Sequence, residues 1–132
     1  APLQSYYITS GYGKRRDPIN KRWAAHYGVD FGSNIKASVY ATAPGIVRLA
    51  GWKGRYGRYV EIDHGNGLRT RYGHLGKIYV KRGEKVEFQQ KIGILGNSGR
   101  TTGPHLHYET VFNGRAINPM KFIKAGHHVF QR

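Results

Sequence analysis

The residues best suited to chemistry are histidines and an acid that lie far apart in the chain. His105 and His107 are two positions apart, and His26 precedes Asp30 by four. On a strand, the two-residue period would place His105 and His107 on one face, about 6.6 Å apart along the chain. Two imidazoles and one carboxylate make three ligands and leave a fourth tetrahedral position for water. That is the stoichiometry of a catalytic zinc site rather than a closed structural one.

His26 and Asp30 could share one ion only if the chain between them bends. Fully extended, they would lie about 13 Å apart, whereas zinc–ligand bonds are about 2.0–2.2 Å long. Gly28 lies between them and gives the backbone the freedom to bend. The residues alone leave open which of His105 and His107 would bind the metal and which would lie beside the open position.

Other catalytic motifs are absent from the sequence. The chain has no cysteine, which excludes disulfides and thiol catalysis and restricts a metal site to histidine and carboxylate ligands. It contains no His-Glu-x-x-His, no phosphate-binding Gly-rich loop and no dinucleotide fingerprint. Residues 96–100 lack the final glycine of a nucleophile elbow.

The elements that would position these residues are short strands. Nineteen glycines and ten tyrosines, against one methionine, favour an antiparallel, nearly all-β domain with many turns. Alternation of apolar and polar residues predicts strands at 39–49 (broken at Pro44-Gly45), 58–64, 68–75, 78–80, 85–88, 92–95 and 105–112. Asn-Gly pairs at 66–67 and 113–114 predict tight turns. In 68–75, period two places Leu68, Thr70, Tyr72 and His74 on one face, and Arg69 and Arg71 on the other.

The length of 132 residues suits a single core. We expect one domain over 1–132, with an irregular N-terminal segment 1–24 and a short tail 120–132. No stretch approaches the roughly 18 apolar residues of a membrane helix, so we expect no transmembrane segment in this chain. The sequence begins Ala1-Pro2-Leu3, without Met or a signal h-region, which indicates a mature form or an excised domain.

The charge balance is strongly basic. Lys and Arg number 22 against 7 Asp and Glu, which gives a formal net charge of +15. The cations are spread along the chain, with Lys14-Arg15-Arg16 as the longest run, so they predict a basic surface rather than a basic tail. Such a surface concentrates polyanions, although a solvated exterior without a specific partner is the alternative.

Five separated motifs stand in a recognisable order. They are His26-x-x-x-Asp30-Phe31-Gly32, Val39-Tyr40-Ala41 with Pro44-Gly45-Ile46-Val47, His64-Gly65-Asn66-Gly67-Leu68, Tyr72-Gly73-His74-Leu75, and Gly103-Pro104-His105-Leu106-His107-Tyr108-Glu109. The chain thereby resembles the lysostaphin/LytM-type zinc endopeptidases of bacterial peptidoglycan, from about Ser10 to Pro119. The resemblance implies a mainly β fold: a compact antiparallel β-sheet domain of the duplicated hybrid motif type, with a groove across the sheet and little helix.

The resemblance also implies the roles of five residues. His26, Asp30 and His107 would bind one Zn²⁺, and His74 and His105 would be the catalytic histidines beside it. Zinc lowers the pKa of its bound water to about 7, so that this water can attack a peptide carbonyl. One histidine would take the water proton and pass it to the departing amine, while the other stabilises the oxyanion.

The implied function is hydrolysis of peptide cross-links in peptidoglycan, outside the cytoplasmic membrane of a bacterium. The bond could be D-alanyl-diaminopimelate or glycyl-glycine. The partner would be the anionic cell wall, and any nucleic-acid binding would be nonspecific. An inhibitory or anchoring segment outside this chain is compatible with the resemblance.

Several residues have two interpretations. Lys36 stands where this family would have a glycine turn. Glu109 shares a strand face with His107 and would either orient that imidazole or form an exposed salt bridge. Asp63 and His64 flank a hairpin turn and are interpreted as turn residues. Three tyrosines would either line the groove or have ordinary core and surface roles: Tyr56, Tyr59 and Tyr79.

Three rival functions follow from the same sequence. A non-catalytic relative would bind wall material or activate an amidase, but all five key positions are present. A nucleic-acid binder would explain the charge but not the histidines and Asp30. A lipoyl- or biotinyl-type carrier is suggested by residues 43–47 and 81–86, but the chain shows no hairpin with the expected modified lysine.

Overall fold

A computed structural model describes most of the chain. Backbone and side chains are described for Pro2, residues 36–96 and residues 106–118, and the backbone alone for residues 7–10, 13–16, 23–26, 29–32 and 105. Twelve strands and one short 3₁₀ helix follow in chain order: β1 (Tyr7–Ser10), β2 (Gly13–Arg16), β3 (Trp23–His26), β4 (Val29–Gly32), β5 (Ser38–Tyr40), β6 (Gly45–Trp52), η1 (Gly54–Tyr56), β7 (Arg58–Gly65), β8 (Leu68–Ile78), β9 (Lys85–Val86), β10 (Lys91–Leu95), β11 (His105–Phe112) and β12 (Arg115–Ile117). Of the residues described, none belongs to a helix with the length and hydropathy needed to cross a lipid bilayer.

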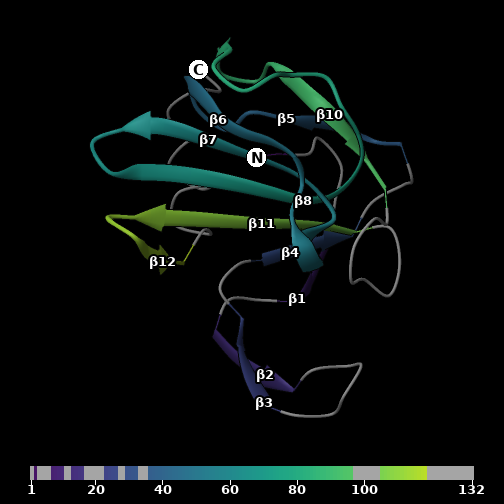
Figure 1. The fold of residues 1–132 in the computed structure, drawn as a ribbon. Coiled ribbons are helices and arrows are strands. Elements are labelled where there is room, and N and C mark those ends of the chain that lie inside the picture. The colour runs from purple at the N-terminus through teal and green to yellow at the C-terminus, as the bar shows by residue number, and fades with distance from the viewer. Residues whose placement is uncertain are drawn as a thin grey trace.

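Ten of the strands form one antiparallel sheet. Its main path runs β1-β4-β11-β8-β7-β6-β9, while β10 pairs with both β5 and β8, and β12 pairs with β11. Strands β2 and β3 form a separate two-stranded sheet. Figure 1 shows β11 lying between β8 and β4 in the centre of the large sheet. The prediction of a mainly β, antiparallel fold with little helix is therefore confirmed.

Most predicted strands are confirmed, and the differences have physical causes. The strand predicted at 105–112 is β11, and the break at Pro44-Gly45 separates β5 from β6. The prediction of a separate strand at 78–80 is wrong, because β8 continues past the end predicted at residue 75 and stops at Ile78. The segment 1–24, expected to be irregular, contains β1, β2 and the start of β3. The tail 120–132 lies outside the described residues.

The core consists of aliphatic and aromatic side chains from the strands and connecting loops. Its buried members are Val39, Ala41, Val47, Val60, Ile62, Tyr72, Leu75, Val80, Val86, Ile92, Leu95, Leu106 and Tyr108. The rings of Tyr72 and Tyr108 lie 5.3 Å apart between centroids, and both hydroxyls contact the Thr42 hydroxyl at 3.0 and 2.8 Å. Strands β8 and β11, which carry His74, His105 and His107, thus belong to a well-packed sheet, whereas His26 lies on β3 of the separate two-stranded sheet.

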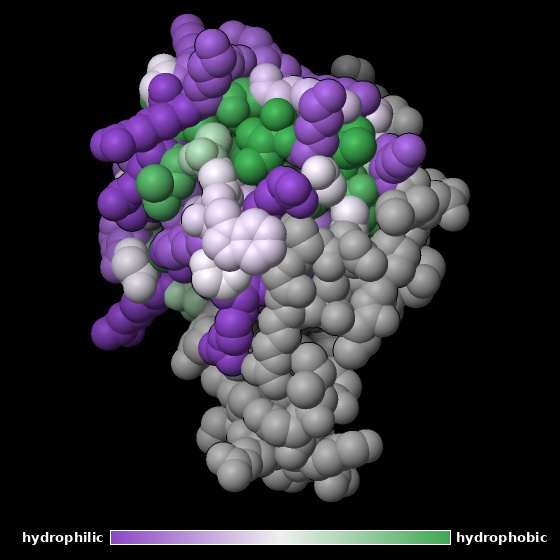
Figure 2. All heavy atoms as spheres, turned by 45° about the vertical axis from the view of Figure 1, so that its right-hand side comes forward, coloured by the Kyte–Doolittle hydropathy of each residue, from purple (hydrophilic) through white to green (hydrophobic). Residues whose placement is uncertain are grey.

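The surface is basic because the cations are exposed and most of the described acids are not. The exposed cations of the described part are Lys36, Arg48, Lys53, Arg55, Arg58, Lys77, Lys81, Arg82, Lys85, Lys91 and Arg115. Among the acids in that part of the chain, Glu87 alone is exposed. Figure 2 shows hydrophilic side chains around a smaller apolar area on one face.

Candidate active site

Strand β11 brings two of the predicted metal ligands into register. His107 lies directly opposite Asp30 on β4 and opposite Gly73 on β8. Residues directly opposite each other in an antiparallel pair share one face, with Cβ atoms about 4.5–5.5 Å apart. The register therefore places positions 30 and 107 side by side on one face, although they are 77 positions apart in the chain.

His74 reaches the same place through a bulge in β8. Arg58 of β7 pairs with Leu75 and Val60 pairs with Tyr72, so Tyr59 faces two residues of β8 where one would normally lie. The second of these, His74, has a φ of 62°, a left-handed conformation that is uncommon for residues other than glycine.

The bulge changes the face to which His74 belongs. Tyr72 lies in the core against Tyr108, whereas the ring of His74 lies 6.1 Å from the ring of His107 between centroids. The prediction that Tyr72 and His74 share a face is therefore wrong, because the extra residue interrupts the two-residue period. The same interruption brings His74 to His107, and backbone strain of this kind is often found at functional sites.

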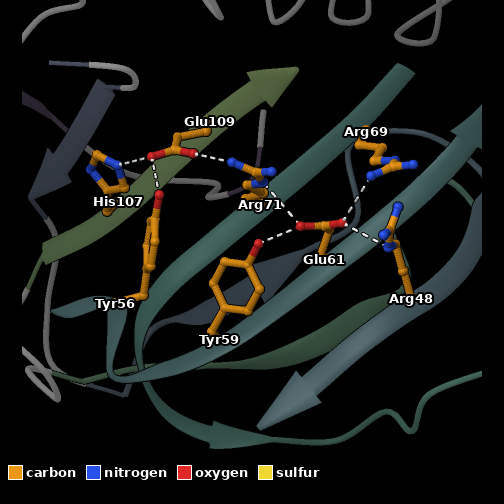
Figure 3. Close-up of polar contacts among 8 residues, drawn as sticks. All are labelled: Arg48, Tyr56, Tyr59, Glu61, Arg69, Arg71, His107 and Glu109. Carbon is orange, nitrogen blue, oxygen red and sulfur yellow. Dashed lines mark hydrogen bonds and ion pairs between the residues drawn. The ribbon is translucent and has the colours of Figure 1, made fainter. Parts of the chain in front are cut away.

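Glu109 orients the imidazole of His107. The Nε2 atom of His107 lies 2.8 Å from Oε2 of Glu109, and Glu109 is only 2% exposed. Tyr56 donates its hydroxyl to the same carboxylate at 2.8 Å, and Arg71 donates an N–H at 3.2 Å. Figure 3 shows the three donors around one acid. Of the two interpretations of Glu109, the exposed salt bridge is wrong.

The hydrogen bonds fix which ring nitrogen of His107 carries a proton. Burial alone would raise the pKa of the Glu109 carboxyl, but the hydrogen bond and charge of His107 and the bonds from Tyr56 and Arg71 hold that pKa below its usual value. An ionised carboxylate only accepts hydrogen bonds, so Nε2 of His107 must be the donor. The nitrogen of His107 that could bind a metal is then Nδ1.

A second buried acid extends this network across the sheet. Glu61 lies opposite Arg71, and Arg71 lies opposite Glu109, so one guanidinium spans two carboxylates at 2.9 and 3.2 Å. Glu61 also accepts a hydrogen bond from the hydroxyl of Tyr59. Two further arginines complete the shell around Glu61: Arg48 at 3.3 Å and Arg69 at 3.8 Å.

Tyr56 approaches the site because residue 73 is a glycine. A Cβ atom at Gly73 would lie 3.2 Å from a ring carbon of Tyr56 and 3.3 Å from its carbonyl oxygen. The Tyr56 ring packs 5.7 Å from the His107 ring between centroids, and burial raises the pKa of its hydroxyl to about 12, so it remains a donor at neutral pH. From the sequence, Tyr56 was expected to line a groove or to have an ordinary core or surface role, so its place in this network was not predicted.

The other predicted site residues are described only in part. His26 ends β3 opposite Gly13 of β2, and His105 lies opposite Gly32 of β4. The side chains of His26, Asp30 and His105 lie outside the described residues. Among the side chains that are described, no group of three potential ligands occurs. The full ligand set therefore stays a prediction.

Asp63 has the turn role expected of it, whereas His64 bonds to residues outside the turn. Asp63 accepts a hydrogen bond from the backbone N–H of Gly65 at 2.9 Å. His64 contacts the carbonyl oxygen of Pro44 and the hydroxyl of Thr70, each at 2.7 Å. Of the three tyrosines with two interpretations, Tyr59 is buried, Tyr56 is half-buried in the network above, and Tyr79 is exposed.

Comparison with known proteins identifies the family. The profile of peptidase family M23 matches residues 24–119. The chain belongs to peptidase family M23. Two M23-like structures are close in fold: a zinc-containing peptidase from Vibrio cholerae, with a TM-score of 0.84 and 42% identity over 90% of this chain and 38% of that one, and the catalytic domain of the antimicrobial peptidase lysostaphin from Staphylococcus simulans, with a TM-score of 0.82 and 38% identity over 90% of this chain and 92% of that one.

One relative is a named peptidoglycan endopeptidase. The chain is 49% identical over 122 residues to the peptidoglycan DD-endopeptidase ShyA of Vibrio cholerae, which covers 91% of this chain and 28% of that protein. The chain thus spans little more than a quarter of that relative's length. The resemblance to lysostaphin-type enzymes that the motifs indicated is confirmed.

Proposed function

We propose that this M23 domain is a zinc-dependent endopeptidase that hydrolyses peptide cross-links of bacterial peptidoglycan. The observation that carries the proposal is the register of β4, β11 and β8, which sets Asp30 opposite His107 and, through the bulge, His74 beside it. Similarity to a peptidoglycan DD-endopeptidase and to a zinc-containing peptidase supports the substrate and the metal.

His26, Asp30 and His107 would hold one Zn²⁺. The donor set fits: imidazole nitrogens and a carboxylate oxygen are ordinary zinc ligands, and His107 already has the outer hydrogen bond to a carboxylate that ligating histidines usually make. When bound, Zn²⁺ would supply Lewis acidity and a water acidic enough to serve as a nucleophile near neutral pH.

His74 and His105 would handle the proton. An imidazole titrates near neutral pH, so it can accept the proton of the attacking water and later donate it to the departing amine. The second imidazole would donate a hydrogen bond to the carbonyl oxygen as negative charge develops there. The left-handed backbone at His74 holds that ring near His107 before substrate arrives.

The exposed cations would hold the domain on its substrate. Peptidoglycan and its associated polymers are anionic, and a basic surface raises the local concentration of a polyanion. Such a substrate requires the domain to work outside the cytoplasmic membrane. We further propose that the cross-link cut is D-alanyl-diaminopimelate rather than glycyl-glycine, because the named relative is a DD-endopeptidase.

The test is digestion of purified peptidoglycan followed by mass spectrometry of the released fragments. Expected are fragments with newly exposed D-alanyl carboxyl and diaminopimelyl amino groups, formed with zinc and abolished by a chelator. His105→Ala should abolish release while zinc remains bound. Stoichiometric zinc without any cleavage would favour the non-catalytic relative, and cleavage of glycyl-glycine bridges would contradict the bond assignment.

A further inference from the structure

Two buried acids on one face of the sheet are joined by a single guanidinium, next to a predicted metal ligand. Glu61 and Glu109 are each 2% exposed, and Arg71, on the strand between them, donates to both. A buried carboxylate is costly unless it is paired and hydrogen-bonded. A change of geometry would leave a buried carboxylate without its partners, so the network should keep one arrangement. It extends from the surface arginine Arg48 to the ring of His107 (Figure 3).

We propose that Tyr56 and Arg71 are positioning residues of the metal site, which act through Glu109 to keep the His107 proton on Nε2 and so direct the Nδ1 lone pair toward the metal. This proposal rests on the proposed function, in which His107 is a zinc ligand. It adds two residues that touch neither the metal nor the substrate in that mechanism.

The two oxygens of Glu109 have different partners, and this difference gives the carboxylate its orientation. Oε1 accepts from Arg71 at 3.2 Å, while Oε2 accepts from both Tyr56 and His107 at 2.8 Å. Arg71 is itself fixed by its Nε bond to Glu61 at 2.9 Å. Rotation of the Glu109 carboxylate would break the bonds of all three donors at once. Arg71 at Oε1 and Tyr56 at Oε2 thus fix the position of the oxygen that accepts the Nε2 proton.

This asymmetry predicts an unusual outcome for Glu109→Gln. Arg71 requires an acceptor, so it should hold the amide oxygen of Gln at the ε1 position and leave the amide NH₂ facing His107. An NH₂ group cannot accept a hydrogen bond. The Nε2 atom would then become the acceptor, and the ring proton would move to Nδ1, the atom that the metal needs.

The experiment measures zinc affinity and the His107 tautomer separately. Zinc Kd would be measured by competition with a chromophoric chelator. The tautomer would be measured in the zinc-free protein by long-range proton–nitrogen NMR, which distinguishes a protonated ring nitrogen from a bare one. Loss of outer hydrogen-bond partners typically costs about 10–100-fold in metal affinity, so Glu109→Gln should weaken zinc binding by that factor and show the proton on Nδ1.

Two milder variants test the positioning residues themselves. Tyr56→Phe removes the hydroxyl but keeps the ring that packs beside Gly73 and His107, and should weaken zinc binding by about tenfold. Arg71→Lys keeps the charge but cannot span two carboxylates as a planar fork, and should have a similar effect. Circular dichroism and thermal unfolding would check that each variant folds.

Tyr59→Phe is the matched control. Its hydroxyl donates to Glu61, at the far side of Arg71, and its ring lies 5.0 Å from that of Tyr56. The same atom is removed from the same face, yet zinc Kd should change by less than about twofold, because the acceptor for His107 keeps its partners.

The outcomes distinguish failure of the positioning proposal from failure of the proposed metal site. Zinc Kd unchanged in Glu109→Gln, or equal losses in Tyr56→Phe and Tyr59→Phe, would overturn the positioning proposal while leaving the enzyme assignment intact. Persistence of the Nε2 proton in Glu109→Gln would overturn it as well. A wild-type protein that binds no zinc, or a His107→Ala variant that binds zinc fully, would instead refute the proposed metal site.

Discussion

Protonation of His64 should destabilise the fold, because this ring ends a buried chain of hydroxyl groups. Nδ1 of His64 lies 2.7 Å from the carbonyl oxygen of Pro44, which only accepts, so Nδ1 donates. In the neutral ring Nε2 must then accept, and its partner is the Thr70 hydroxyl at 2.7 Å. Thr70 in turn contacts the Tyr72 hydroxyl at 2.8 Å. Each hydroxyl has one proton, so the direction of every bond in the chain follows.

The chain therefore has one polarity while His64 is neutral. Tyr108 donates to Thr42, Thr42 to Tyr72, Tyr72 to Thr70 and Thr70 to His64. A protonated His64 would present a donor to Thr70 and force these buried bonds to reverse or to break. Burial lowers the pKa of His64, and this effect exceeds the opposing effects of the Pro44 carbonyl and the Asp63 carboxylate.

The sign and size of the effect follow from proton linkage. In the unfolded chain His64 has an ordinary histidine pKa of about 6.5, and in the fold its pKa is lower. Below about pH 6.5 the folded state therefore binds fewer protons than the unfolded state does at the same pH. The contribution of His64 is fully present above about pH 6.5 and decreases by up to about 1.4 kcal/mol per pH unit down to the pKa of the folded state.

Urea unfolding at several pH values between about 5 and 7.5, with zinc removed by chelator, would measure this. The wild-type protein should exceed His64→Asn in unfolding free energy most at the upper end of the range, where two hydrogen bonds worth about 1 kcal/mol each are lost. The difference should shrink as the pH falls, because only the wild-type protein loses stability through protonation of His64. The other histidines titrate in both proteins and cancel in the difference. A difference that stays constant across the range would refute the reasoning.

Three further perturbations have predicted outcomes. Lys36→Gly should raise the unfolding free energy by up to about 1 kcal/mol, since Lys36 has a φ of 67° and the left-handed strain of roughly 1–2 kcal/mol exceeds the entropic cost of glycine; a lower melting temperature would contradict this. Gly73→Ala should cost about 1–3 kcal/mol by overpacking against Tyr56 and should also weaken zinc binding, whereas an unchanged zinc Kd would contradict the role of this contact. Binding of the domain to peptidoglycan, measured by sedimentation, should weaken between about 0.1 and 1 M salt as the Debye length falls from about 10 to 3 Å; binding insensitive to salt would show that the +15 charge does not hold it there.

Local patterns were sufficient to predict several elements of the fold. Both Asn-Gly turns have positive φ at both residues, at 54° and 83° for Asn66 and Gly67 and at 50° and 81° for Asn113 and Gly114, as type I′ hairpin turns require. Lys36 adopts the left-handed conformation for which the family would use glycine. These features depend on a few neighbouring residues, and such residues are visible in the sequence.

Features that depend on register could not be predicted in this way. The row formed by Glu61, Arg71 and Glu109 joins three strands, and a shift of one residue in either pairing would dissolve it. The placement of His74 depends on a bulge. A prediction from alternating faces assumes a regular strand without an extra residue, so it could not anticipate this placement. The contact between Glu109 and His107 was one of two interpretations of Glu109, but the parts played by Tyr56, Arg71 and Glu61 were missed, although each residue was visible in the sequence.

The most direct test of the whole account is the zinc content of the purified protein and its single alanine variants, measured by mass spectrometry of the metal. One zinc per chain is predicted for the wild-type protein, His74→Ala and His105→Ala, and substantially less for His26→Ala, Asp30→Ala and His107→Ala. Full zinc occupancy in the last three variants would contradict the account, because the metal would then be bound elsewhere.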